Sequence, residues 1–119
     1  MVNLLQLMIS KLEEVHENCH LEQAPEGTAY PYITYNLPNS NEQEFREDFI
    51  LEVNIWDKSS DTTALETLTD NVDKKINRLK YIDENMQVSF YRINRMMIPD
   101  PDPNIRRREL RYQVKTYFI

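Results

Sequence analysis

The stretch DFILEVNIWD, residues 48–57, alternates between apolar and polar side chains and decides how the chain is organised. Its apolar residues occupy every second position from Phe49 to Ile55, while Glu52 and Asn54 fall on the opposite side of an extended backbone. This period of two predicts a β-strand with one face in a core and the other face turned away from it.

The segment that follows, residues 58–82, has the spacing of an amphipathic helix. Ser60 or Asp61 is expected to cap its start. Acidic residues gather early in the segment and basic residues late, which complements the helix dipole. The predicted buried stripe consists of Leu65, Leu68, Val72, Ile76 and Leu79.

The N-terminal part of the chain predicts a further helix and a short strand. Apolar residues recur every three or four positions over about residues 2–18. A proline-rich turn with the chain's one glycine, Gly27, then leads to a predicted strand at 32–37. Residues 38–48 are expected to form a polar loop.

Two long strands are predicted at the C-terminus, over residues 86–98 and 108–118. In the first of them the apolar phase shifts along the strand, which indicates a β-bulge near residues 90–91. Eleven strand residues span about 36 Å, which is longer than a typical strand. We therefore expect the tip of this hairpin to project beyond the body.

These elements follow the order α-β-β-α-β-β and predict an α+β fold. Both β-β connections are short enough for antiparallel hairpins. The simplest architecture is a four-stranded antiparallel sheet with both helices packed on one face and a long, protruding C-terminal hairpin. Residues 1–119 are expected to form a single domain.

Charge is distributed unevenly along the chain. The net charge is −6, which divides into −10 over residues 1–91 and +4 over residues 92–119, the C-terminal arm. A single cysteine, Cys19, excludes an internal disulfide and fits a reducing cytoplasm. The apolar residues of the N-terminus are spaced rather than continuous, so neither a signal peptide nor a membrane span is predicted.

Few residues suggest a catalytic, metal-binding or phosphate-binding site. His16 and His20, with Cys19 between them, would share a face if the first helix continued, as zinc ligands do. The alternative, a polar and frayed helix end, is favoured because the chain has no other histidine. One glycine cannot build a phosphate-binding loop. We expect no catalytic site, no cofactor and no metal.

The proline-rich loop and the arginines of the arm remain as the candidate functional site. Three alternatives are open: a solvated hairpin end, a nucleic-acid contact through the arginines, and contact with another copy of the chain. Self-contact is favoured, because a basic arm and an acidic body on one chain attract each other, and contacts between unlike patches close into rings or continue into filaments. The candidate interface residues are Asp100, Asp102, Ile105, Arg106, Arg107, Arg108 and Arg111.

Three stretches together carry a resemblance to a known family: APEGTAYPYITYNLP before and along the first strand, EDFILEVNIWDKSSDT, and YRINRMMIPDPDPNIRRRELRYQVKTY. With the order of elements, they resemble the tail terminator, or tail completion, proteins of long-tailed bacteriophages and prophages. The resemblance spans nearly the whole chain and contains no catalytic signature.

The resemblance implies a small α+β subunit that assembles into a hexameric ring. Such a ring caps the tail tube, stops its polymerisation and offers the head connector a docking surface. Double-stranded DNA would pass through the ring without specific binding, and the protein would occupy the host cytoplasm before joining the virion tail. Alternatives are another head–tail connector or neck protein, or a small nucleic-acid-binding or regulatory protein that uses the basic hairpin.

Overall fold

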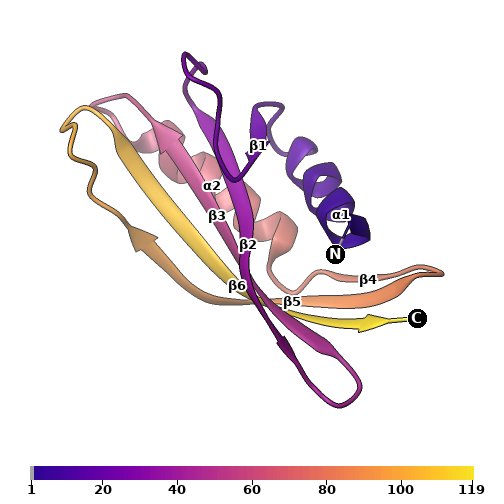
Figure 1. The fold of residues 1–119 in the computed structure, drawn as a ribbon. Coiled ribbons are helices and arrows are strands. Elements are labelled where there is room, and N and C mark those ends of the chain that lie inside the picture. The colour runs from indigo at the N-terminus through magenta and orange to yellow at the C-terminus, as the bar shows by residue number, and fades with distance from the viewer. Residues whose placement is uncertain (1) are drawn as a thin grey trace.

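The structure is a computed structural model that describes residues 2–119. Over these residues it contains two helices and one sheet of six strands (Figure 1). In chain order the elements are α1 (Val2–Glu13), β1 (Cys19–Leu21), β2 (Tyr32–Glu42), β3 (Glu47–Asp57), α2 (Thr63–Ile76), β4 (Lys80–Ile82), β5 (Met86–Met97) and β6 (Arg106–Phe118).

The strand order in the sheet is β1-β2-β3-β6-β5-β4. Strands β1 and β2 run parallel, and every other neighbouring pair is antiparallel. The predicted α+β class is confirmed. The prediction of four antiparallel strands is wrong, because a short strand of three residues is added at each edge, and one of the two makes the sheet mixed.

Strand β1 forms where the first helix was expected to continue. The helix ends at Glu13, and the carbonyl oxygen of Leu12 accepts hydrogen bonds from the amides of both Val15 and His16. The amide of Ile33 then donates to the carbonyl of Asn18 and starts the parallel pairing with β2. Pairing with a neighbouring strand therefore outweighs the helical pattern of residues 14–18.

Strand β4 similarly replaces the end of the second predicted helix. Helix α2 stops at Ile76, Asn77 is extended, and Arg78 has a positive φ of 64°. The Arg78 amide then donates to the Phe90 carbonyl, and the Phe90 amide donates to the Leu79 carbonyl. These bonds bring the chain alongside β5, so Leu79 does not extend the buried stripe of the helix.

The polar segment 38–48 is not a loop. Strand β2 continues through Pro38 to Glu42, with a register shift between Asn36 and Asn39, and β3 already begins at Glu47. The turn is closed by a hydrogen bond from the Gln43 amide to the Arg46 carbonyl. The end of this hairpin extends away from both helices in Figure 1. Its polar composition marks a solvated hairpin rather than a lack of structure.

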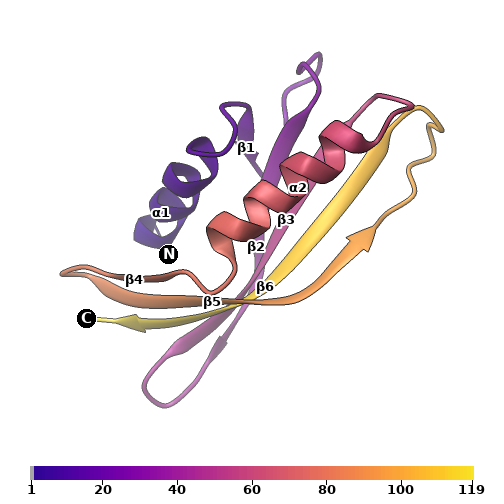
Figure 2. The same cartoon turned by 180° about the vertical axis from the view of Figure 1, so that it is seen from behind.

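The buried side chains form one cluster between the helices and one face of the curled sheet (Figure 2). Alternate residues of β3, β6 and β5 reach it, including Leu51, Tyr112 and Phe90. Helix α1 contributes its buried residues Leu4, Leu7, Met8 and Leu12. Helix α2 contributes Leu65, Thr69, Val72 and Ile76, with Leu68 partly buried.

The predicted bulge exists, but at Ile93. The register between β5 and β6 shifts between Arg92 and Asn94, two residues beyond the predicted place. Before the shift, Arg92 lies opposite Tyr112 on the helix side; after it, Arg95 lies opposite Leu110 on that same side. The bulge therefore directs both Arg92 and Arg95 toward α2.

Removing a fully buried side chain from the centre of the sheet tests this core. We expect Leu51→Ala to lower the free energy of unfolding by about 2–5 kcal/mol, because Leu51 is fully buried and the cavity would be only partly filled. Urea unfolding followed by circular dichroism measures the change. Val2→Ala, at the exposed start of α1, is the control and is expected to change the value by less than about 0.5 kcal/mol.

Candidate subunit interface

The three consecutive arginines of the arm lie on opposite faces of the sheet. In β6, Arg106 and Arg108 lie opposite Asp57 and Ile55 on the helix side, whereas Arg107 lies opposite Trp56 on the other face. Arg111 shares the face of Arg107, which no helix covers. The predicted basic cluster is therefore two separate groups.

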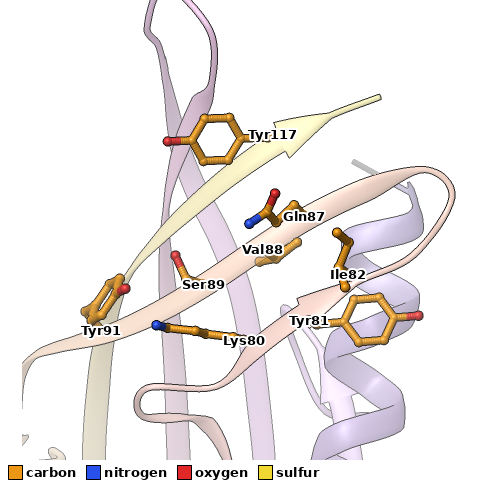
Figure 3. A pocket seen from close by; sticks show the side chains of 8 residues that line it. All are labelled: Lys80, Tyr81, Ile82, Gln87, Val88, Ser89, Tyr91 and Tyr117. Carbon is orange, nitrogen blue, oxygen red and sulfur yellow. The ribbon is translucent and has the colours of Figure 1, made fainter.

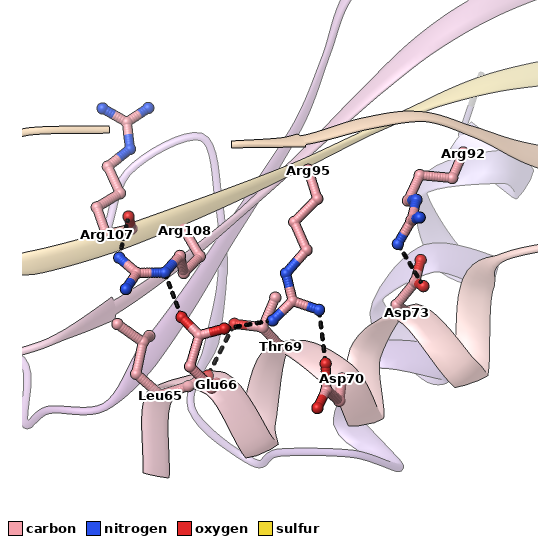
Figure 4. Close-up of polar contacts among 9 residues, drawn as sticks. All are labelled: Leu65, Glu66, Thr69, Asp70, Asp73, Arg92, Arg95, Arg107 and Arg108. Atoms are coloured by element: carbon pink, nitrogen blue, oxygen red, sulfur yellow. Dashed lines mark hydrogen bonds and ion pairs between the residues drawn. The ribbon is translucent and has the colours of Figure 1, made fainter. Parts of the chain in front are cut away.

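The helix-side group is a ladder of ion pairs between α2 and the C-terminal strands (Figure 4). The carboxylates of Glu66, Asp70 and Asp73 are spaced by four and three residues and so lie along one face of α2. Arg95 binds Asp70 at 2.5 Å and Glu66 at 2.6 Å. Arg108, whose side chain is 12% exposed, donates from Nε to Glu66.

The ion pair between Arg92 and Asp73 connects the ladder to the core. Arg92 binds Asp73 at 2.9 Å. The hydroxyl of Tyr112 donates to the other oxygen of Asp73 at 2.7 Å. Burial, and then the hydrogen bond to Asp73, raise the pKa of Tyr112 far above its ordinary value, so its hydroxyl stays protonated and remains the donor.

These contacts shift the pKa values of the helix carboxylates. Desolvation acts to raise the pKa of Glu66, but the hydrogen bonds from Arg108 and Arg95 outweigh it and the pKa is lowered. The hydrogen bond from Arg95 lowers the pKa of Asp70. Both groups are therefore held in their charged form.

On the uncovered face, Arg107 lies at the centre of a second network. Its guanidinium lies over the Trp56 ring, 4.6 Å from the centroid, and its Nε donates to Asn54 at 2.9 Å. Arg107 and Arg111 flank Glu109, each at 3.3 Å, and Arg111 also binds Glu52 at 2.8 Å. Glu109 is only 3% exposed, so the arginines cover a buried carboxylate.

The aspartates of the proline-rich loop fold the loop itself. An Asp100 carboxylate oxygen accepts the Asp102 amide, and an Asp102 carboxylate oxygen accepts the Asn104 amide, both at 2.9 Å. The Ile105 amide donates to the Asp102 carbonyl at 3.1 Å. The two carboxylate contacts are Asx turns, which satisfy backbone amides in a loop where proline cannot donate. Ile105 is half-buried and lines a shallow, largely apolar cavity of about 290 Å³ beside the loop.

The arm is therefore not a free basic surface. Arg92, Arg95, Arg107, Arg108 and Arg111 all bind carboxylates of the same chain. Within residues 2–119, Arg106 is the arm arginine without a carboxylate partner, and it donates to the Pro103 carbonyl. The premise that unpaired arm charges attract the body of another copy is wrong. Contact of another copy with the seven candidate residues stays a prediction, without that electrostatic reason.

The histidines and the cysteine do not converge. His16 follows α1 and bonds through Nε2 to the Pro31 carbonyl, while His20 lies in β1 and bonds to Asn18. The two histidines share no helix face, because α1 ends before both of them. Burial raises the pKa of Cys19 to about 12, and its thiol donates to the His16 carbonyl. Residues 2–119 contain no cluster of three or more metal-ligating side chains.

Two strands of the sheet have an open edge over part of their length. Beyond Tyr35, residues 36–42 of β2 pair with β3 only. On the other side of the sheet, residues 93–97 of β5 pair with β6 only. The register places these segments on opposite edges and at opposite ends of the sheet. Unpaired backbone groups on such edges accept a strand from another chain.

Neither helix within residues 2–119 has the length and apolar character needed to cross a membrane.

Comparison with known proteins supports the fold. The chain resembles a chain in the virion of a native gene transfer agent particle, with a TM-score of 0.66 over 89% of this chain and 84% of that chain. The two sequences are 8% identical, so the likeness shows a shared fold. No family model matches the sequence. No curated protein matches it either.

Neutralising Glu66 tests how much the ion-pair ladder contributes to the free energy of unfolding. We expect Glu66→Gln to lower the free energy of unfolding by about 1 kcal/mol, because two arginines lose a charged partner that is partly screened by solvent. Thermal or urea unfolding measures the change. Glu84→Gln, in an exposed turn, removes the same charge as a matched control and should leave the value nearly unchanged. Equal effects of the two variants would contradict a specific role for the ladder.

The ladder also predicts a pH dependence. Because the pKa values of Glu66 and Asp70 are lowered on folding, their stabilisation is fully present above their ordinary values of 4.5 and 3.8. It is lost as pH falls through the lower folded-state values. The free energies of unfolding of wild type and of Glu66→Gln/Asp70→Asn are therefore expected to differ at neutral pH and to converge once the pH falls below the lowered pKa values of Glu66 and Asp70. A difference that persists there would mean that packing, not charge, is responsible.

Proposed function

We propose that this protein is a non-enzymatic structural protein of a phage or phage-like virion. Within that class we propose a tail terminator, a ring that caps the tail tube and joins it to the head connector. The observation that carries the proposal is the fold, which matches a chain of a gene transfer agent virion over most of both chains. The resemblance of the sequence to tail terminators supports the narrower role.

The open strand edges support assembly of copies into a ring. A β2 edge and a β5 edge are different surfaces, so contact between them is heterologous. Heterologous contacts form closed rings when the rotation between copies closes. The two edges lie on opposite sides of each subunit, so each copy could engage two neighbours at once. A hexamer is the ring that the family resemblance implies.

The paired arginines count against the nucleic-acid alternative. A phosphate group would have to displace Glu66 from Arg108, or Glu52 and Glu109 from Arg111. DNA would therefore meet an arm in which five of the six arginines already bind carboxylates, on a chain of net charge −6. This is consistent with DNA that passes through a ring without being held.

Measuring the mass of the assembly tests the proposed function. Light scattering and native mass spectrometry over a concentration series are expected to show one closed species, with six copies in the ring. Negative-stain electron microscopy is expected to show rings with a central opening. A two-fold dimer or an unchanging monomer, together with tight DNA binding that weakens steeply with salt, would favour the binder instead.

The strand edge itself can be blocked. The Ile98 amide donates to Arg107, so the amide of the preceding Met97 points away from β6. Met97 is 69% exposed, and we expect Met97→Pro to leave the monomer folded while it removes an outward donor and prevents ring formation.

Met97→Thr keeps the amide and is the matched control. Light scattering compares the two variants. Rings that survive Met97→Pro would show that this edge is not the contact.

A further inference from the structure

We propose that the end of the β2–β3 hairpin of one copy docks into a pocket beside β4 of a second copy, with Phe45 as the inserted side chain. The proposal rests on the proposed self-assembly and names the surfaces that make it. The hairpin end, residues 42–47, is called the tip below. The pocket, called the β4 pocket, lies where β4, β5 and the end of β6 meet (Figure 3).

The tip combines an exposed aromatic ring with unpaired acids. Phe45 is 81% exposed, among the most exposed of the large apolar side chains in residues 2–119. Glu42, Glu44 and Glu47 have no cationic partner within those residues, whereas Arg46 is bound to Asp48 at 2.9 Å. An exposed aromatic ring flanked by acids is the kind of anchor that an apolar hollow with positive charge covers in an interface.

The β4 pocket has the complementary character. It has a volume of about 290 Å³, and its apolar walls come from side chains that include Ile82, Tyr91 and Tyr117 (Figure 3). Lys80 lines it, and the ammonium of Lys115 lies 5.4 Å from the centroid of the Tyr91 ring. Neither lysine has a carboxylate partner within residues 2–119, in contrast to five of the six arginines of the arm. An apolar hollow with two free cations fits an aromatic ring flanked by glutamates.

The strand edges place the two surfaces together. If residues 93–97 of β5 in one copy pair antiparallel with β2 of the next, with Met97 opposite Asn36, then Ile93 lies opposite Ser40. Strand β2 runs on for two residues beyond Ser40, about 7 Å, before the turn that carries Phe45. It continues along β5 toward Tyr91, a wall of the β4 pocket. A single contact between two copies therefore includes both the paired strand edges and the docked tip. It uses the β5 edge and the β4 pocket of one copy and the β2 edge and the tip of the other.

A photocrosslinker at the tip tests the contact directly. The photocrosslinker p-benzoylphenylalanine replaces Phe45 in the full-length protein, and the assembled protein is irradiated. We expect residue 45 of one copy to be joined to the segment 80–91, or to Tyr117, of another copy. Peptide mass spectrometry of the crosslinked dimer identifies the segment. Crosslinks confined to other segments would overturn the contact.

Substitutions give a second, independent measurement. We expect Phe45→Ser to weaken association by about tenfold or more, since a central aromatic residue dominates such interfaces. Val2→Ser removes a similarly exposed apolar side chain on α1 and is expected to leave association unchanged. Lys80→Glu is expected to weaken association, and Lys80→Glu with Glu44→Lys in the same chain to restore it, because the charges are exchanged across the contact.

The outcomes separate this contact from the proposed ring. Rings that form as well with Phe45→Ser as with wild type would overturn the docking and leave the ring intact. A wild-type chain that stays monomeric at all concentrations would overturn both. Loss of rings with Phe45→Ser and Lys80→Glu, together with rescue by the charge exchange, supports the contact.

Discussion

Strand β6 is the constraint on which the rest of the structure depends. It is paired along nearly its whole length with β3 on one side and β5 on the other, so its alternation of faces is fixed by two ladders at once. Leu110, Tyr112 and Val114 are thereby committed to the core. The same alternation separates Arg107 from Arg106 and Arg108. A cluster that is continuous in sequence is divided because the backbone is extended.

The period of two along residues 48–57 predicted β3 and its buried face from sequence, and the long C-terminal hairpin followed from the same kind of pattern. The short edge strands could not be found in this way. Strands β1 and β4 are three residues long, and each exists because a distant partner supplies hydrogen bonds at a helix end. The polar hairpin 38–48 was missed because solvated strands lack an apolar face.

The candidate site was only partly predictable, because charge along a sequence does not show which charges have partners. The arm carries +4 in sequence, yet its ion pairs lead to α2 and β3 of the same chain. The spacing of Glu66, Asp70 and Asp73 was the available signal, since residues three and four apart share a helix face. The unpaired charges that the proposed docking uses lie at a hairpin turn, beside a three-residue strand and late in β6, where no sequence motif marks them.

The bulge at Ile93 lets two arginines with an odd separation in sequence face the same helix. Arg92 and Arg95 are three positions apart, so with regular pairing Asn94 would lie opposite Leu110 and the guanidinium of Arg95 would turn to the uncovered face. Deleting Ile93 would leave residues 94–97 opposite their present partners in β6 and would remove only the bulge. Natural variants of this fold can therefore keep both arginine pairs either with a bulge and a separation of three, or with a regular strand and a separation of two.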